Sequence, residues 1–311
     1  MKHLNCSYRN INGIVLLDKP LDISSNNVLQ NVKRLYYAKK AGHTGSLDPL
    51  ATGMLPICLG EATKFSQFLL NADKRYKVTA KLGERTNTSD AKGQIINRRP
   101  VLLNKTKLMT ELNYFLGEKK QVPSIFSALK YQGRPLYEYA RKGIPVVREA
   151  RPINIYDLKL HHWDLTKLEL EIHCSKGTYI RTIIDDLGER LGCGAHVIAL
   201  RRIAIANYSS KDMITLKTIQ AIHTETRQET LACLDALLLP IDSALIAMPT
   251  INIPSSLADR VLLGQPINLI APPTVGLVRM IYGTTNQFFG IGEITSQALL
   301  IPRRLIAKNC I

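Results

Sequence analysis

The ten residues from Lys74 to Gly83, KRYKVTAKLG, alternate apolar and polar side chains along the chain. A period of two is typical of a β-strand that buries one face. The apolar face of this stretch is Tyr76, Val78, Ala80 and Leu82. We therefore expect a half-buried strand here, with Tyr76 pointing into the core.

A helix is predicted from Thr178 to Leu191, TYIRTIIDDLGERL, where isoleucines and leucines recur at helical spacing. Thr178 is a candidate N-cap and Gly192 a candidate stop. Arg181 lies off the apolar stripe. The neighbouring Asp185 and Asp186 point about 100° apart on a helix, so we expect them to form a polar edge that faces solvent.

Other periodic segments predict helices and strands that alternate along the chain. Helices are expected at 25–36, 61–70, 215–223 and 228–238, and strands at 13–17, 168–174 and 197–206. Pro249 and Pro254 mark a change of composition, so we place a domain boundary near Thr250. Beyond it we expect a short helix at 256–263 and strands at 276–282, 288–295 and 298–306.

The charge of the chain indicates a polyanionic partner. Among 311 residues, 41 are lysine or arginine and 25 are aspartate or glutamate, so the formal net charge is +16. The segment 119–151 holds eight cations against two acids and interleaves them with Phe126, Tyr131, Tyr137 and Tyr139. Nucleic-acid surfaces use this mixture for phosphate contact and base stacking, although a solvated face with ordinary core aromatics has the same composition.

Cysteine usage and the N-terminal sequence favour a cytoplasmic protein. The six cysteines, Cys6, Cys58, Cys174, Cys193, Cys233 and Cys310, include no CxxC pair and are too sparse for a disulfide scaffold. The first ten residues, MKHLNCSYRN, lack the apolar region of a signal peptide, and we expect no membrane span. We expect no metal either, because His43 has no HExxH partner, His161 and His162 are adjacent, and Cys193 with His196 is half of a zinc set.

Glycine is densest from Gly42 to Gly53, GHTGSLDPLATG, with the single carboxylate Asp48 in its middle. Such a loop lets the backbone approach a ligand closely and holds a side chain outside regular secondary structure. The spacing is not that of a phosphate-binding Walker loop, because no lysine follows Gly45. An Asx-type turn before Pro49 is the simple structural explanation of Asp48.

Six motifs in this order resemble bacterial tRNA pseudouridine synthases of the TruB family, which modify the T-loop uridine at tRNA position 55. They are GIVLLDKP from Gly13, GHTGSLDPLATGMLP from Gly42, GEATKF from Gly60, KRYKV from Lys74, QVPSIFSALKYQG from Gln121 and CSKGTYIRTIIDDLGERLG from Cys174. The tail, with GLVRMIY from Gly276, GIGEI from Gly290 and PRRL from Pro302, resembles more loosely the family's PUA domain.

This resemblance implies a fold. We expect an α+β catalytic domain with a mixed, largely antiparallel sheet over residues 1–250, including an RNA-gripping insertion at about 119–151, and a small PUA-like β-barrel over 251–311. The implied reaction isomerises uridine to pseudouridine and requires no cofactor. The implied partner is the T-stem-loop of tRNA, with no obligate protein partner.

The resemblance also implies roles for residues. Asp48 matches the catalytic aspartate, which attacks the sugar, and Arg181 matches the arginine that keeps it ionised. On spacing alone Arg181 pairs equally well with Asp185 at i, i+4. Tyr76 matches the tyrosine that stacks on the uracil and assists proton removal. The remaining matches to substrate-binding positions are His43, Tyr179, Leu200, Asp90 and Lys19.

These matched positions have ordinary explanations as well. Tyr76 and Leu200 suit a core, Tyr179 a helix start, His43 its own turn, and Asp90 an Asx turn before Gly93. One departure from the family is Asp22, where the pattern Lys-Pro-x-Gly after the first strand has glycine. A left-handed turn there costs less with aspartate than with most residues.

Phosphate contacts are expected from the insertion, with Lys130, Arg134, Arg141 and Lys142 as candidates. Two other functions fit the same surface: a tRNA-folding chaperone without catalysis, and a guide-RNA-dependent pseudouridine synthase. The sequence does not determine which tRNAs are preferred, whether other RNAs are substrates, or what the oligomeric state is. It also leaves open whether the first attack is at C1′, at uracil C6 or through a glycal intermediate, and how important chaperone activity is.

Overall fold

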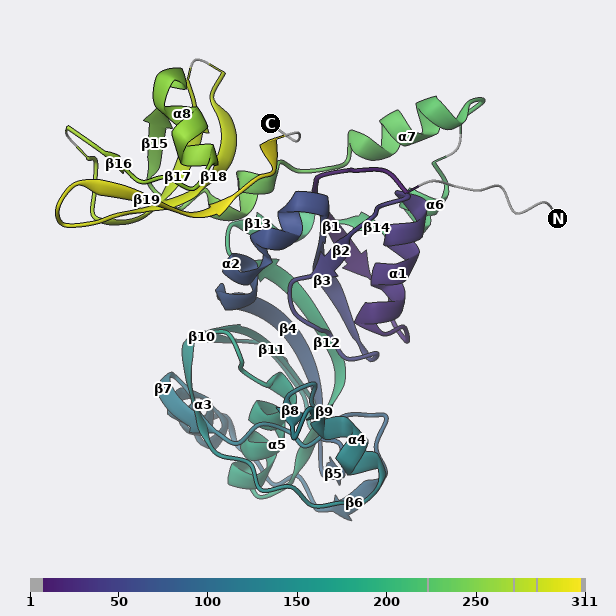
Figure 1. Ribbon diagram of the computed structural model, residues 1–311. Coiled ribbons are helices and arrows are strands. Elements are labelled where there is room, and N and C mark those ends of the chain that lie inside the picture. The colour runs from purple at the N-terminus through teal and green to yellow at the C-terminus, as the bar shows by residue number, and fades with distance from the viewer. Residues whose placement is uncertain (1–7, 223, 271, 284, 309–311) are drawn as a thin grey trace.

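The computed structural model describes residues 8–308 except 223, 271 and 284 (Figure 1). Cys6 and Cys310, the N-terminal residues before Tyr8, and the last residue of the helix expected at 215–223 lie outside the described residues. Among the described residues no helix is long and apolar enough to cross a membrane.

One ten-stranded mixed sheet dominates the first 250 residues. Its strands are β1 (Gly13–Lys19), β2 (Ala41–His43), β3 (Ala51–Leu59), β4 (Lys74–Leu82), β7 (Gly117–Gln121), β10 (Arg151–Trp163), β11 (Lys167–Cys174), β12 (Ala195–Ile205), β13 (Tyr208–Ser209) and β14 (Ile214–Thr215). The order is β14-β1-β3-β12-β4-β11-β10-β7, with β2 on β3 and β13 on β12. Only β1–β14 and β3–β12 are parallel among these pairs, so the predicted largely antiparallel sheet is confirmed.

Helices cover this sheet at its two ends (Figure 1). They are α1 (Ser25–Leu35), α2 (Ser66–Asn71), α3 (Lys105–Tyr114), α4 (Leu136–Arg141), α5 (Ile180–Leu191), α6 (Leu216–Gln220) and α7 (Arg227–Asp235), with 3-10 turns η1 (Gly60–Lys64), η2 (Ser210–Asp212) and η3 (Ile241–Leu245). Two small hairpins, β5 (Glu84–Thr86) with β6 (Ile95–Arg98) and β8 (Lys130–Tyr131) with β9 (Arg134–Pro135), lie near α5 and α4.

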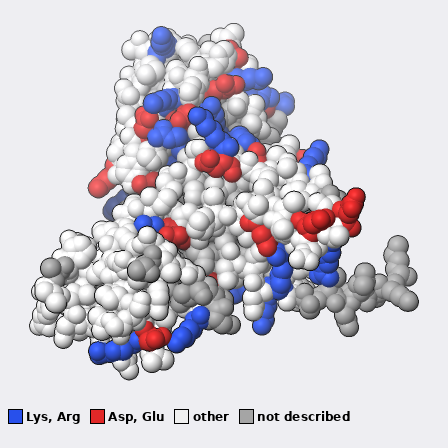
Figure 2. Space-filling model, turned by 90° about the horizontal axis from the view of Figure 1, so that it is seen from above, with Lys and Arg blue, Asp and Glu red and all other residues white. Residues whose placement is uncertain are grey.

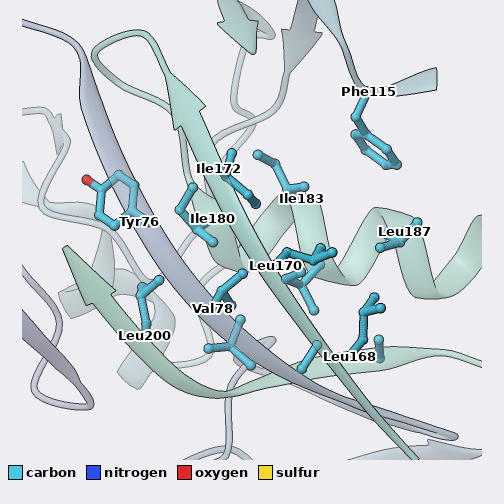
Figure 3. Packing of buried hydrophobic residues seen from close by; sticks show 14 of the residues in the cluster. Tyr76, Val78, Phe115, Leu168, Leu170, Ile172, Ile180, Ile183, Leu187 and Leu200 are labelled. Atoms are coloured by element: carbon cyan, nitrogen blue, oxygen red, sulfur yellow. The ribbon is translucent and has the colours of Figure 1, made fainter. Parts of the chain in front are cut away.

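The helix α5 packs its apolar stripe on the long central strands. Ile180, Ile183 and Leu187 meet side chains of β4 and β11 in one buried cluster (Figure 3). Tyr76 is 9% exposed and belongs to this cluster, so its predicted inward direction is confirmed. The packing fixes the first turn of α5, which carries Arg181, against the strand that carries Tyr76.

Two predictions about α5 are wrong. The side chain of Thr178 donates to the Ser175 carbonyl at 2.9 Å, and the N-cap is Tyr179, whose side chain makes no capping bond. Asp185 does not face solvent, because Arg85 of β5 binds it through two hydrogen bonds of 2.8 and 2.9 Å. The neighbour β5 comes from a distant part of the sequence, so helical spacing could not reveal this pair.

The helix predicted at 61–70 is broken in two. Phe65 separates η1 from α2 with φ −108° and ψ 1°. Its ring is buried and lies edge-on to Phe288 at 5.3 Å between centroids. Because Phe288 belongs to the C-terminal sheet, tertiary packing of Phe65 sets the break that local periodicity conceals.

The C-terminal sheet has five strands in the order β15-β17-β18-β19-β16. They are β15 (Thr250–Ile253), β16 (Ile267–Asn268), β17 (Gly276–Tyr282), β18 (Gln287–Ile294) and β19 (Leu299–Leu305), and α8 (Ser255–Leu262) packs on them. The sheet curls into a half-barrel, as expected of a PUA-like domain (Figure 1). Lys64 donates to the Leu305 carbonyl at 3.0 Å and Arg304 to the Lys64 carbonyl at 2.8 Å, which joins this sheet to η1.

We predict that Gly188→Ala destabilises the fold more than Gly192→Ala. A Cβ at Gly188 would lie 2.1 Å from the Ala195 amide nitrogen, so α5 could not pack on β12 as closely. We expect a loss of about 3 kcal/mol in the free energy of unfolding for Gly188→Ala. Gly192 has φ 87° and no atom within 4 Å of a Cβ, so backbone strain alone applies there, about 1 to 2 kcal/mol. Urea denaturation checks this, and wild-type stability of Gly188→Ala would show that the packing is looser than described.

Candidate active site

A cavity of about 400 Å³ opens beside the central strands. Its walls come from the loop between β2 and β3, from β4 and β12, from the insertion at 127–129 and from the segment that enters α5. Asp48, Tyr76, Tyr179, Leu200 and Arg181 all line it. Five of the residues singled out from the sequence are thus brought together around one cavity, although they span more than 150 positions of the chain.

The side chain of Ser25 and a backbone turn fix the loop that carries Asp48. The Ser25 hydroxyl accepts from the Leu47 amide at 2.8 Å and donates to the Leu47 carbonyl at 3.0 Å. The Ala51 amide donates to the Asp48 carbonyl at 3.0 Å and closes a turn around Pro49. This is a backbone turn and not the expected Asx-type turn, because among the described residues the Asp48 carboxylate accepts from no backbone amide and pairs with Arg181 instead. The carboxylate lies at the cavity wall.

Arg181 pairs with Asp48, not with Asp185. Its Nε lies 2.8 Å from Asp48 Oδ2, and its side chain is 5% exposed. The same guanidinium donates to the Phe126 carbonyl at 2.8 Å and to the Thr88 carbonyl at 3.1 Å. Arg181 therefore connects the catalytic loop, the insertion and the turn after β5.

Asp90 serves two purposes at once. Its Oδ2 lies 3.4 Å from Arg181 Nη1, and its Oδ1 accepts from the Lys92 amide at 3.0 Å, which is the Asx turn expected before Gly93. It does not line the cavity. Asp90 is therefore a second carboxylate on Arg181, behind Asp48.

The pKa of the Asp48 carboxyl is raised above its usual value. Burial is the main cause, because the carboxylate is recessed among protein atoms even though the cavity leaves part of it accessible. Arg181 opposes the shift, Asp90 adds to it, and Lys19 opposes it further. The adjacent guanidinium therefore favours the ionised form of this carboxylate.

Lys19 is completely buried at the end of β1 and supports the loop from outside the cavity. Its Nζ donates to the Pro20 carbonyl at 2.7 Å and, at 3.4 Å, to that of Pro49. Burial lowers the pKa of Lys19 to about 8, while Asp48 and Asp22 favour its charged form. Asp22 adopts φ 60°, the left-handed turn anticipated where the family has glycine.

His43 lies on β2, outside the residues that line the cavity. Its Nδ1 is buried without a hydrogen-bond partner among the described residues. Burial and the nearby Arg202 lower the pKa of His43, so the ring is neutral at pH 7. An aromatic ring without charge suits stacking better than phosphate contact.

The four cations expected to contact phosphate lie on the insertion, exposed and away from the cavity. Lys130 is on β8, Arg134 on β9, and Arg141 and Lys142 are at the end of α4. Arg141 stacks over the Tyr137 ring at 5.2 Å. On the face seen in Figure 2, by contrast, cations and carboxylates are interspersed rather than gathered in one patch.

Several polar residues of the cavity wall were not predicted from the sequence, among them Lys74, Ser127 and Arg202. Two of them carried a signal. Lys74 precedes Tyr76 by two on β4, and Arg202 follows Leu200 by two on β12, so alternation places both cations on the inward face. Ser127 carried no comparable signal, because no regular element contains it.

Among the described residues no group of three or more histidine, cysteine, aspartate or glutamate side chains could hold a metal ion. The thiols of Cys58, Cys174, Cys193 and Cys233 are free, and the first three are buried.

Three family models match consecutive parts of the chain. Residues 33–180 match the N-terminal domain of TruB family pseudouridylate synthases. Residues 181–246 match the tRNA pseudouridylate synthase B C-terminal domain, and residues 249–306 match the C-terminal domain described as pseudouridine synthase II TruB. The first boundary falls inside α5, so it does not correspond to a break in the main sheet.

Curated relatives align along nearly their whole length. The tRNA pseudouridine synthase B of Sodalis glossinidius (strain morsitans) is 68% identical over 300 residues, which cover 96% of each chain. That of Vibrio parahaemolyticus serotype O3:K6 is 56% identical over 301 residues, again 96% of each.

Solved structures show the same fold. A crystal structure of a Cbf5-Nop10-Gar1 complex aligns with TM-score 0.73 and 23% identity, covering 98% of this chain and 87% of that one. The mixed sheet, the curled C-terminal domain and a cavity built on one aspartate define an RNA pseudouridine synthase. The chain belongs to the TruB family of these enzymes, which confirms the family, fold class and enzyme class predicted from the motifs.

We predict that Arg181→Met raises the pKa of Asp48 further, because the adjacent charge that opposes the effect of burial is then lost. Titration of ¹³C-labelled aspartate carboxyls by NMR measures this, with the Asp48 signal assigned by its loss in Asp48→Asn. Arg85→Met, which removes the partner of Asp185, should leave the Asp48 value unchanged. An unchanged or lower pKa in Arg181→Met would contradict the electrostatic role of Arg181.

Proposed function

We propose that this enzyme isomerises the uridine at position 55 of the tRNA T-loop to pseudouridine, with Asp48 as nucleophile. The observation that carries the proposal is the Asp48–Arg181 pair, 2.8 Å apart at the wall of a cavity of nucleoside size. A binding protein would gain nothing from a recessed carboxylate that faces phosphate-rich RNA.

The chemistry requires one carboxylate. Asp48 attacks C1′ of the ribose, the C1′–N1 bond breaks, and its electron pair remains on the uracil. The uracil turns, C5 bonds to C1′ and the ester to Asp48 breaks. C5 then loses its proton and N1 takes up a proton, which gives pseudouridine with no change of oxidation state.

A uridine inside a folded T-loop must be flipped out to reach this cavity. Tyr76, from β4, supplies an aromatic face for the base, and Leu200 and Tyr179 supply the apolar and aromatic walls. The Tyr76 phenol is buried, and burial raises its pKa, so it enters the reaction neutral. It can take the C5 proton only after it has given up its own proton, a loss that the nearby positive charge of Arg202 favours.

The wider RNA surface combines two parts. We assign residues 1–250 to catalysis, with the insertion at about 119–151 gripping the T-arm, and 251–311 to a PUA-like RNA-binding domain. The exposed cations Lys130, Arg134, Arg141 and Lys142 make phosphate contacts. His43 contacts the RNA beside the cavity, and Asp90, which lies behind Asp48, acts through Arg181. The reaction takes place in the cytoplasm, where buried free thiols such as Cys58 stay reduced.

We predict that Asp48→Asn abolishes pseudouridine formation, lowering the rate by at least about 10⁴-fold, because an amide cannot attack C1′. Tritium release from tRNA labelled at uracil C5, with chelator present, measures the rate. Asp22→Asn is the matched control, because Asp22 is an exposed carboxylate paired with Lys92 at 2.7 Å. If both variants released tritium at the wild-type rate, Asp48 would not be the nucleophile.

The same assay separates the other two functions. A chaperone would bind tRNA and release no tritium in its wild-type form. A guide-dependent enzyme would release tritium only after a guide RNA is added.

We predict that tRNA binding weakens steeply with salt. The double change Arg141→Gln with Lys142→Gln should reduce the log–log salt slope by about 1 to 2, since each lost phosphate contact removes about 0.7 to 0.9. Filter binding over a salt series measures the slope. Lys217→Gln on α6, an exposed lysine at the other end of the sheet, should leave it unchanged. A flat salt dependence in the wild type would refute the electrostatic grip.

A further inference from the structure

Arg202 is a buried cation placed directly across the sheet from Tyr76. In the β4–β12 register, Arg202 is the partner of Tyr76, and in the β3–β12 register it is the partner of Gly53. Its side chain is 2% exposed. The guanidinium donates to the Met54 carbonyl at 2.7 Å and to the carbonyl of Gly45, in the catalytic loop, at 3.0 Å.

Lys74 is a second buried cation on the same wall. Its Nζ donates to three carbonyls at the end of α2, those of Leu69 at 3.0 Å, Leu70 at 2.8 Å and Ala72 at 2.5 Å. Burial and, as a smaller cause, the charge of Arg202 lower its pKa to about 8, so the ammonium is mostly protonated at pH 7. The two positive charges therefore act on one another and on the interior of the same cavity.

Neither cation has a carboxylate partner. In the part of the chain that the structure describes, no aspartate or glutamate oxygen forms an ion pair with Arg202 or Lys74, whereas Arg181 has two such partners. Of the four charged residues on the cavity wall, three are cations and one, Asp48, is an anion. Burying charge without a counter-ion is costly, and carbonyl dipoles offset only part of that cost.

The proposed reaction creates the missing negative charge inside this cavity. When Asp48 attacks C1′ and the C1′–N1 bond breaks, the bonding electron pair leaves with N1, and the uracil becomes an anion whose charge spreads over N1, O2 and O4. Fixed charges that are already in place stabilise such an intermediate without reorganisation. The free base also needs to turn, which favours a broad positive field over one directional hydrogen bond.

We propose that Arg202 and Lys74 stabilise the uracil anion that forms when the C1′–N1 bond breaks. The inference rests on the proposed function and adds a role to two residues outside the Asp48–Arg181 pair. Because its Nη2 also holds the Gly45 carbonyl, Arg202 links this field to the position of the nucleophile's loop.

The test uses the stability of the leaving base. Fluorine at uracil C5 withdraws electrons and stabilises the anion by itself, so cleavage of 5-fluorouridine depends less on the protein's charge. We expect Arg202→Gln to slow single-turnover loss of uridine from a T-arm RNA by about 100-fold, and loss of 5-fluorouridine by only about tenfold. Nuclease digestion followed by chromatography and mass spectrometry measures both losses in the same way.

The ratio of the two rates is independent of how much of a variant is folded, because a partly unfolded preparation lowers both rates equally. Lys74→Gln should change the ratio in the same direction. It is the variant to use if Arg202→Gln does not fold. Arg201→Gln is the matched control, since Arg201 neighbours Arg202 on β12 but pairs with Asp18 at 2.7 Å. Its ratio should equal that of the wild type.

If the variants slow the conversion of uridine and of 5-fluorouridine by the same factor, the proposal is wrong, and Arg202 and Lys74 are structural residues. If the two rates fall by the same factor and RNA binding is also weaker, the two cations instead bind a phosphate of the RNA. If wild-type protein converts neither nucleoside, the proposed function itself fails, which distinguishes that failure from the failure of this inference.

Discussion

The ion pair between Arg181 and Asp48 is the interaction on which the site depends. Arg181 begins α5, and Asp48 sits in a turn between β2 and β3, more than 130 residues earlier in the chain. The guanidinium also binds carbonyls of the insertion and of the turn after β5. Burial favours the protonated carboxyl and the adjacent guanidinium favours the ionised form, so this one arginine both joins four segments and acts on the charge of Asp48.

That network connects the insertion to the cavity. The insertion presents exposed cations at its tip, and its base contributes Phe126, whose carbonyl accepts from Arg181, and Ser127, which lines the cavity. In the proposed function, a T-arm held at the tip therefore contacts the same segment that binds Arg181. The main sheet supports this arrangement, because β12 pairs with both β3 and β4 and so joins the Asp48 half to the Tyr76 half.

Much of this could be predicted from the sequence, because the strand at Lys74 and the helix before Leu191 have clean periods and the motifs are specific. Periodicity places Tyr76 inward but says nothing about which acid faces Arg181, because Asp48 and Asp185 are equivalent until the chain is folded. The same limit explains the break at Phe65, whose ring packs on a strand more than 200 residues away. Arg202 and Lys74 were visible as inward-facing cations, yet their lack of carboxylate partners is a property of the tertiary structure.

We propose that one carboxylate, whose ionised form Arg181 favours, isomerises one uridine in tRNA without a cofactor. Mapping pseudouridine by carbodiimide modification and primer extension along an unmodified tRNA transcript, after incubation with the purified protein and chelator, tests this directly. We expect a single stop that reports pseudouridine at T-loop position 55. Stops at other positions, or none while the tRNA is bound, would contradict the account.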